Sequence, residues 1–332
     1  MKITYIFLTP SKERSIERVF IPIMLQMEKK GHETKSSFTW NMRFWPLTLL
    51  VNVIRYALKS HFEGIYHITG DVQYVACFMN PYNTILTIHD CVMLHNTAAP
   101  VWLKKMIHKY WYEKPLRKLK YIVCISETTR QDLIAFFPWI ADKLIVVPNP
   151  VGEEFHYTPK ILNEKCPQIL HVGTRSNKNL ERVIEALAGI KCQLNIIGKL
   201  SDVQQILLKK HAINYKNSFH VSDNEIVSAY QSADIISFPS LFEGFGMPII
   251  EGQTIGRPVL TSDREPMKSV AGKNACIVNP ESVESIRQGF LRLLYDAKYR
   301  EKVTLDGQIN AKMYNISNVL FGYESIYKQI LK

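Results

Sequence analysis

Short apolar runs alternate with longer segments of helical periodicity through both halves of this 332-residue chain. In the first half the apolar runs cover residues 3–8, 83–90 and 121–127, and the second half starts the alternation again with residues 168–173 and 193–198. A repeated strand–helix unit folds as a parallel sheet with helices on both faces. Because 332 residues exceed what one hydrophobic core usually holds, we predict an α/β protein with two Rossmann-like, doubly wound domains facing each other across a cleft.

One strand–loop–helix unit of the second half has the features of an anion-binding site. The apolar residues 233–238 predict a buried strand, and a glycine loop ending in Gly246 leads into an apolar helical segment at Met247. Such a turn points backbone N–H groups and a helix N-terminus at an anion. Glu243 and Glu251 bracket it, which suits a ligand with hydroxyls on both sides of a diphosphate, such as a nucleotide sugar. The alternative is that such a glutamate only complements the helix dipole.

Two further loops of the second half follow predicted strands and carry basic residues. Arg175 and Lys178 follow one strand, and Gly198 and Lys199 follow the next. The loops after parallel strands meet at one edge of a sheet, so we expect these cations to lie beside Glu243. Cations for a diphosphate and acids for hydroxyls together form a coherent nucleotide-sugar site.

A histidine in the first half occupies a comparable position. The apolar strand predicted at residues 83–90 ends in His89 and Asp90. Open α/β sheets bind ligands at the carboxyl ends of their strands, so His89 is a candidate functional residue. A structural role, with the imidazole satisfied by its neighbours, is the alternative.

The composition excludes several classes of protein. No stretch of about 18 uncharged apolar residues is present, so we expect no transmembrane helix. The first residues lack a small-residue cleavage site and are interpreted as a strand and not as a signal peptide. The six cysteines are scattered without a CxxC pair or a zinc spacing, which indicates reduced thiols in a cytoplasmic protein and no metal site.

The net charge of +11 is unevenly distributed: residues 1–150 contain 19 Lys and Arg against 11 Asp and Glu. A basic half suggests an anionic partner. Residues 38–59 and 102–120 mix aromatic and basic side chains in helical patterns. Each segment fits either a helix packed on the sheet or a face for an anionic membrane. No nucleic-acid motif accompanies the second segment, so we expect no nucleic-acid partner.

Four segments together resemble the retaining glycosyltransferases of the GT-B fold, family four (group 1). The segments, in order, are Val146-Val-Pro-Asn-Pro150, His171-Val-Gly-Thr with Lys178-Asn-Leu-Glu-Arg, Tyr230-Gln-Ser-Ala-Asp234 ahead of Phe238-Pro-Ser, and Glu243-Gly-Phe-Gly-Met-Pro-Ile-Ile-Glu251. The last resembles the family's signature of two glutamates separated by seven residues. The resemblance is strong in the second half and weaker in the first, where Ser11–Ser15 replaces the family's glycine pair.

The resemblance implies a role for each matching residue. Lys178 and Arg175 would bind the donor diphosphate, and Glu243 would contact the hydroxyls of the donor sugar. Backbone amides would approach the sugar and phosphate, and Glu251 would bind the ribose. His89 would lie near the reacting centre. The amides are those of Phe245, Gly246 and Met247.

The domains expected on this basis are an acceptor-side domain at residues 1–152, a donor domain at 153–312 and a C-terminal helix at 313–332 that crosses back to the first domain. The predicted reaction moves a sugar from a nucleotide-sugar donor to a glycan or lipid-linked acceptor in bacterial surface polysaccharide synthesis. It needs no cofactor or metal, because Lys178, Arg175, amides and a helix dipole stabilise the leaving diphosphate. The protein would be cytoplasmic and peripheral to the inner membrane face. A sugar-nucleotide epimerase or a basic nucleic-acid-binding protein is the alternative.

Overall fold

The structure is a computed structural model that describes residues 1–9, 15–40, 47–95, 99–273 and 275–331. The chain divides into two compact units: residues 1–150 together with 316–332, and residues 151–315. The boundaries expected at 152 and 312 lie within three residues of these. Among the described residues, no helix combines the length and apolar composition needed to cross a bilayer.

The first unit contains a six-stranded, entirely parallel sheet in the order β2-β1-β3-β4-β5-β6. Its strands are β1 (Lys2–Phe7), β2 (Glu33–Phe38), β3 (Ile65–Ile68), β4 (Thr84–Ile88), β5 (Tyr121–Cys124) and β6 (Leu144–Val146). β3, β4 and β5 are buried throughout, as expected for central strands covered on both faces.

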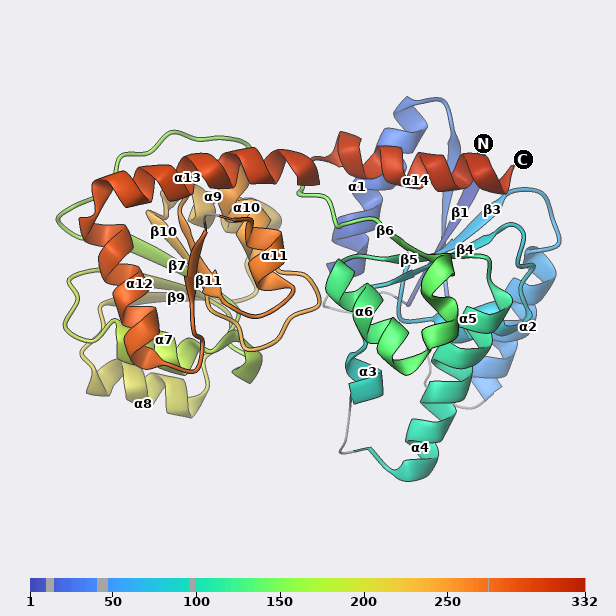
Figure 1. Ribbon diagram of the computed structural model, residues 1–332, viewed down its shortest axis with the longest axis horizontal. Coiled ribbons are helices and arrows are strands. Elements are labelled where there is room, and N and C mark those ends of the chain that lie inside the picture. The colour runs from blue at the N-terminus through green and yellow to red at the C-terminus, as the bar shows by residue number, and fades with distance from the viewer. Residues whose placement is uncertain (10–14, 41–46, 96–98, 274, 332) are drawn as a thin grey trace. The chain divides into compact units, whose positions relative to one another are not determined.

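Helices cover both faces of this sheet (Figure 1). The helices of this unit are α1 (Ser15–Lys29), α2 (Leu47–Lys59), the 3₁₀ helix η2 (Gln73–Phe78), α3 (Val92–His95), α4 (Val101–Met106), the π-helix η3 (Ile107–Glu113), α5 (Lys114–Lys118), α6 (Glu127–Phe136), the 3₁₀ helix η4 (Pro138–Lys143) and α14 (Ile316–Ile330). The single helix predicted at 102–120 is thus three segments, with a π-helix in its middle.

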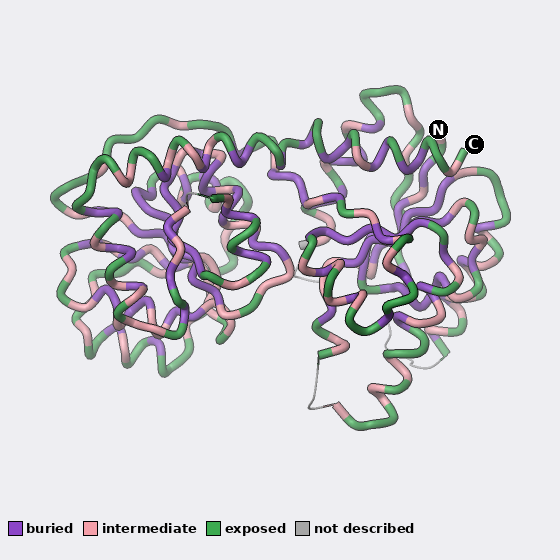
Figure 2. Tube along the Cα trace, viewed as in Figure 1, coloured by how far each residue is buried: buried purple, intermediate pink, exposed green. Residues whose placement is uncertain are grey.

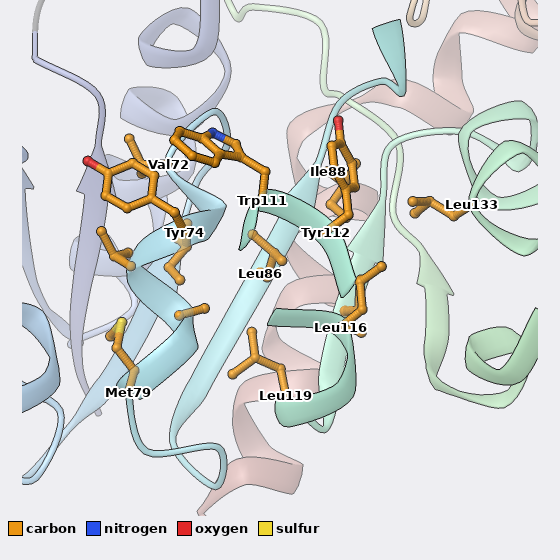
Figure 3. Packing of buried hydrophobic residues seen from close by; sticks show 14 of the residues in the cluster. Val72, Tyr74, Met79, Leu86, Ile88, Trp111, Tyr112, Leu116, Leu119 and Leu133 are labelled. Atoms are coloured by element: carbon orange, nitrogen blue, oxygen red, sulfur yellow. The ribbon is translucent and has the colours of Figure 1, made fainter. Parts of the chain in front are cut away.

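Two apolar clusters, one on each face, stabilise the first unit. One lies between the sheet and η2, η3 and α5, where the rings of Tyr74 and Trp111 are 4.8 Å apart (Figure 3). The other joins α1 and the returning helix α14, whose Tyr327 hydroxyl lies 2.6 Å from Nδ1 of His67. The last helix of the chain therefore completes the core of the first unit.

The second unit repeats the architecture with the parallel order β12-β11-β10-β7-β8-β9. Its strands are β7 (Gln168–Val172), β8 (Gln193–Ile197), β9 (Tyr215–Ser218), β10 (Ile235–Phe238), β11 (Val259–Ser262) and β12 (Cys276–Val278). Its helices are the 3₁₀ helix η5 (Ser176–Lys178), α7 (Leu180–Ala186), α8 (Asp202–Lys210), α9 (Asp223–Ser232), α10 (Met247–Ile255), α11 (Met267–Ala271), α12 (Val283–Tyr295), α13 (Ala297–Ala311) and the 3₁₀ helix η6 (Lys312–Tyr314).

Residues 152–167, which lack a helical or strand pattern, are bound to the second unit. Lys160 forms an ion pair with the buried Asp234, and Asp234 Oδ1 also accepts from the amide of Asn163 at 3.2 Å. Phe155 packs edge-on against Tyr230, with ring centroids 5.4 Å apart. These contacts hold the segment against the second unit.

Candidate active site

The strand–glycine loop–helix predicted around residue 246 is present. β10 runs into a loop, and Gly246 stands before the first residue of α10 with φ +113°, a conformation that L side chains rarely adopt. No side chain caps the helix, and Pro248 has no N–H to donate. The amide of Met247 is among the N-terminal N–H groups that have no acceptor within a helix. This helix start is therefore suited to an anionic ligand.

The predicted cation and acid of this loop cluster are in direct contact. Lys178 Nζ donates to Glu243 Oε1 at 2.6 Å, and the two side chains are only 21% and 14% exposed. The Lys178 ammonium also lies 4.8 Å from the ring centroid of Phe238 at the end of β10. The partly desolvated surroundings strengthen the attraction between these charges relative to a surface pair.

Asn177, which the sequence did not single out, ties the two loops together. Its Nδ2 donates to Phe242 O at 3.0 Å and to Glu243 Oε1 at 3.2 Å. Its backbone carbonyl accepts from the amide of Leu241 at 2.8 Å. Glu243 Oε1 thus receives two side-chain donors from the loop after β7, which hold the carboxylate in place.

Asn179 is part of the quoted motif that begins at Lys178, but sequence reasoning assigned it no role. It is buried with φ +63°, and its Nδ2 donates to Pro239 O at 3.0 Å and to Pro280 O at 2.7 Å. Asparagine adopts this left-handed conformation more readily than most residues. In the sequence, this turn is indicated by an asparagine immediately before a predicted helix. The turn places Lys178 next to Glu243.

Glycines at two strand ends allow close approach of neighbouring side chains. Gly173 has φ +96°, and a Cβ there would lie 2.8 Å from Lys178 Cγ. Gly198 has φ +141°, and a Cβ there would lie 2.8 Å from Thr174 Cγ2. The hydroxyl of Thr174 donates to Lys199 O at 2.6 Å, which joins the loops after β7 and β8.

Two other predicted cations, Arg175 and Lys199, are more exposed than Lys178. The side chains of Arg175 and Lys199 are exposed, and Lys199 follows β8, on the far side of β7 from β10. The structure places both at the carboxyl edge of the sheet, as predicted. Direct contact with Glu243 is shown for Lys178 and Asn177.

Glu251, the second acid of the motif, is positioned by a buried tyrosine. Tyr230 on α9 donates its hydroxyl proton to Glu251 Oε2 at 2.5 Å. Burial, together with the neighbouring carboxylate, raises the pKa of Tyr230 well above its ordinary value, so the hydroxyl remains a donor. Tyr230 was quoted in the sequence motif, but its hydrogen bond to Glu251 required the structure.

His89, in the first unit, lies just after β4 and is held by backbone contacts. Its Nε2 donates to Thr69 O at 2.7 Å, and its own carbonyl accepts from Thr129 Oγ1 at 3.2 Å. Burial lowers the pKa of His89 below its ordinary value, against the opposing effects of the Thr69 carbonyl and of Asp71. The imidazole is therefore neutral near pH 7, and with Nε2 protonated its lone pair is on Nδ1.

Ser126 caps the start of α6. Its Oγ accepts from the amide of Thr129 at 3.1 Å at the beginning of α6. This cap fixes the residue that binds the His89 carbonyl, so it also positions His89. Among the described residues, no group of three or more His, Cys, Asp or Glu side chains is arranged to hold a metal ion.

The chain is similar to known glycosyltransferases along most of its length. Residues 3–155 match the model of Glycosyltransferase Family 4, and residues 154–308 match the model of Glycosyl transferases group 1. O-antigen chain mannosyltransferase B of Escherichia coli is 24% identical over 303 residues, which cover 82% of this chain and 76% of that protein.

Two further similarities concern a longer protein and a solved structure. The serotype-specific mannosyltransferase WbdA of Escherichia coli is 26% identical over 249 residues, or 67% of this chain, and the match spans only 30% of WbdA. The structure of HepE from Anabaena, in complex with UDP and glucose, superposes with a TM-score of 0.76 at 12% identity and covers 99% of both chains.

The two family models follow one another along almost the whole chain, and each coincides with one of the parallel-sheet units. The Lys178–Glu243 contact and the uncapped start of α10 lie within the group 1 model. The fold is the one that GT-B glycosyltransferases share. The chain belongs to the group 1 glycosyltransferases of family four.

Proposed function

We propose that this protein is a retaining glycosyltransferase that moves a sugar from a nucleotide-sugar donor to a glycan or lipid-linked acceptor in bacterial surface polysaccharide synthesis. Both sequence relatives described above are named mannosyltransferases, so a mannosyl nucleotide is the first donor to test. HepE, which shares the fold, was crystallised with UDP and glucose, which supports a nucleoside diphosphate as the leaving group.

The observation that carries the proposal is the 2.6 Å contact between Lys178 and Glu243 beside the start of α10. A diphosphate bound at the helix N-terminus would compete with Glu243 for the Lys178 ammonium. The released carboxylate could then accept hydrogen bonds from the hydroxyls of the donor sugar. In this proposal, donor binding separates the pair, so that Lys178 binds the diphosphate and Glu243 binds the sugar.

The proposed chemistry follows from where charge develops. Breaking the bond between sugar and phosphate builds negative charge on the diphosphate, which Lys178, Arg175 and the amides of α10 would stabilise without a metal ion. Retention implies attack from the face that the phosphate leaves, with a phosphate oxygen taking the proton of the acceptor hydroxyl. In this scheme Glu243 orients the sugar, Glu251 holds the ribose, and His89 is the candidate contribution of the first unit.

A groove in the first unit supports an anionic, lipid-linked acceptor. It has a volume of about 480 Å³. Its lining combines apolar side chains with three lysines, a histidine and one glutamate: Met93, Leu94, Phe136, Lys104, Lys105, Lys109, His108 and Glu113. Phosphate groups suit the lysines and lipid chains suit the apolar side chains. An acceptor of this kind is the reason for proposing that the protein works at the inner face of the membrane.

Donor recognition can be tested before the acceptor is known. Thermal unfolding of the full chain would be followed with GDP, UDP and their mannose and glucose conjugates. A ligand at 100 times its Kd stabilises the native state by about 2.7 kcal/mol, so a true donor produces a concentration-dependent rise in Tm. Lys178→Ala should abolish this rise, and Lys298→Ala, at an exposed position near the beginning of α13, should leave it unchanged.

Transfer itself would then be measured with membrane extracts as acceptor. Glu243→Ala and Lys178→Ala should each abolish incorporation of labelled sugar while the circular dichroism spectrum stays native. Full activity of both variants would contradict the proposed site. Release of nucleotide together with an altered free sugar, without an acceptor, would identify an epimerase and overturn the proposal of transfer.

A further inference from the structure

Helix α2 shows an unusual distribution of polarity for a helix on the surface of a unit. Leu47, Leu50, Ile54 and Leu58 are 63%, 56%, 50% and 64% exposed, and their spacing places them along one stripe of the helix. The buried positions of the same helix are Thr48, Asn52 and Tyr56. Four large apolar side chains therefore point outward, whereas Leu49 and Val53 of the same helix pack against the core.

Hydrogen bonds hold the helix in this orientation. Asn52 Oδ1 accepts from the amide of Trp40 at 2.9 Å, and Asn52 Nδ2 donates to Trp40 O at 3.2 Å and to Tyr74 OH at 3.1 Å. The hydroxyl of Tyr56 is 3.0 Å from Ser37 Oγ. Rotating α2 to bury its leucines would break these bonds and leave Asn52 unpaired. The outward apolar stripe is thus specified by the fold.

Exposed aromatic residues extend the stripe onto neighbouring segments. Phe62 follows α2 and is 70% exposed, and Phe78 at the end of η2, which packs along α2, is 58% exposed. Trp40, whose backbone binds Asn52, is 58% exposed. Figure 2 shows α2, labelled in Figure 1, with exposed segments on the outside of the first unit. We call the stripe and these three aromatic residues the α2 face.

Several cations border the α2 face, and the exposed Glu63 follows Phe62. Lys35, Arg55 and Lys59 lie close enough together that burial and the two other cations lower the pKa of Lys59. On the side of η2, Lys118 Nζ lies 6.0 Å from the ring centroid of Phe78. Residues 47–62 contain no Asp or Glu. An apolar stripe with a cationic border is the pattern of a surface that rests in the headgroup region of an anionic membrane.

We infer that the α2 face docks the first unit onto an anionic lipid bilayer. The inference deepens the proposed function, because it names the residues that would bring the enzyme to a lipid-linked acceptor. A second copy of the chain fits this surface less well, since a symmetric interface would bring the two groups of Lys35, Arg55 and Lys59 together. Nucleic acid would use the cations but would leave the leucines in water.

The test measures binding of the full chain to sedimenting vesicles, so it is independent of glycosyl transfer. Vesicles of phosphatidylcholine alone are compared with vesicles that also contain phosphatidylglycerol, at low and at high salt. The inference predicts strong binding to the anionic vesicles that weakens with salt. Leu50→Ser combined with Ile54→Ser should weaken it about 10- to 30-fold, from two half-exposed apolar side chains. Lys59→Ala should weaken it about fivefold.

Leu305→Ser is the matched control, because Leu305 lies in the second unit and is 52% exposed. It should bind vesicles as the unchanged protein does. Equal binding by the Leu50/Ile54 double variant would overturn the inference, as would binding that is indifferent to lipid charge and salt. Dimerisation without lipid that the double variant abolishes would assign the face to a second copy. Tighter binding to an RNA oligonucleotide than to vesicles would assign it to nucleic acid.

Discussion

Gly173→Ala tests whether the position of Lys178 determines donor binding. Gly173 ends β7 with φ +96°, and a Cβ at this position would lie 2.8 Å from Lys178 Cγ and 3.0 Å from its Cε. Contacts of this length between carbon atoms are repulsive, so the lysine side chain must move. The substitution thereby displaces the ammonium from Glu243 and from the proposed diphosphate site without removing any charged group.

Two effects of different size are expected. An alanine in a positive-φ conformation costs about 1–2 kcal/mol of stability. A displaced Lys178 loses a charge-assisted hydrogen bond worth about 1.5–3 kcal/mol, which corresponds to roughly a 10- to 150-fold weaker affinity for the donor diphosphate. The first effect appears in unfolding and the second in ligand binding, so they can be measured separately.

Gly189→Ala separates the two effects experimentally. Gly189 has φ +74° in the same unit, and a Cβ there would have no atom within 4 Å. Both variants would be compared by urea unfolding and by calorimetric titration with the donor nucleotide identified by thermal shift. We expect similar losses of stability and a loss of affinity for Gly173→Ala alone. Equal affinities in the two variants would refute the role assigned to the position of Lys178.

Three further predictions concern other parts of the molecule. Tyr230→Phe removes the donor to Glu251 and should weaken nucleotide binding about tenfold, measured by titration, whereas the exposed Tyr295→Phe should not. Gly70→Ala would place a Cβ 2.7 Å from His89 Cδ2, so kcat should fall at least tenfold with unchanged donor affinity. Gly31→Ala is the control, because no atom lies within 4 Å of its Cβ. Equal kcat values in the two variants would count against a role for His89. Burial lowers the pKa of both His67 and His171 to about 3. Because the unfolded state then binds more protons, stability should be complete above about pH 6.5 and fall on acidification by up to about 1.4 kcal/mol per pH unit for each histidine. Urea unfolding between pH 7.5 and 5 checks this, and a flat profile would contradict it.

The central strands and the donor motif were predictable because their signals are local. β4, β5 and β10 are short, mainly apolar runs, since both of their faces are buried. The glycine loop before α10 needs a residue with positive φ, and Gly246 provides it. Parallel topology then implies that the loops after β7 and β10 share an edge, which is where Lys178 meets Glu243.

The edge strands β2 and β9 were not predicted. They read Glu-Thr-Lys-Ser-Ser-Phe and Tyr-Lys-Asn-Ser and are largely exposed, so no apolar run marks them. Residues 152–167 carry no periodic signal either, because their binding to the second unit depends on single contacts such as Lys160 with Asp234. Contacts between residues distant in sequence leave no periodic pattern to detect.

The amino-acid sequence by itself determined the class of fold, the strand–loop–helix at Gly246 and the pairing of acids with cations at one sheet edge, because hydrophobic periodicity and glycine conformation act over a few residues. Only the tertiary structure decided which groups touch. It showed that Asn177 and Lys178 donate hydrogen bonds to Glu243 and that Tyr230 donates one to Glu251. It also showed that α14 belongs to the first unit. It also showed the orientation of α2, in which Asn52 binds Trp40 and Tyr74 and a stripe of apolar side chains stays exposed.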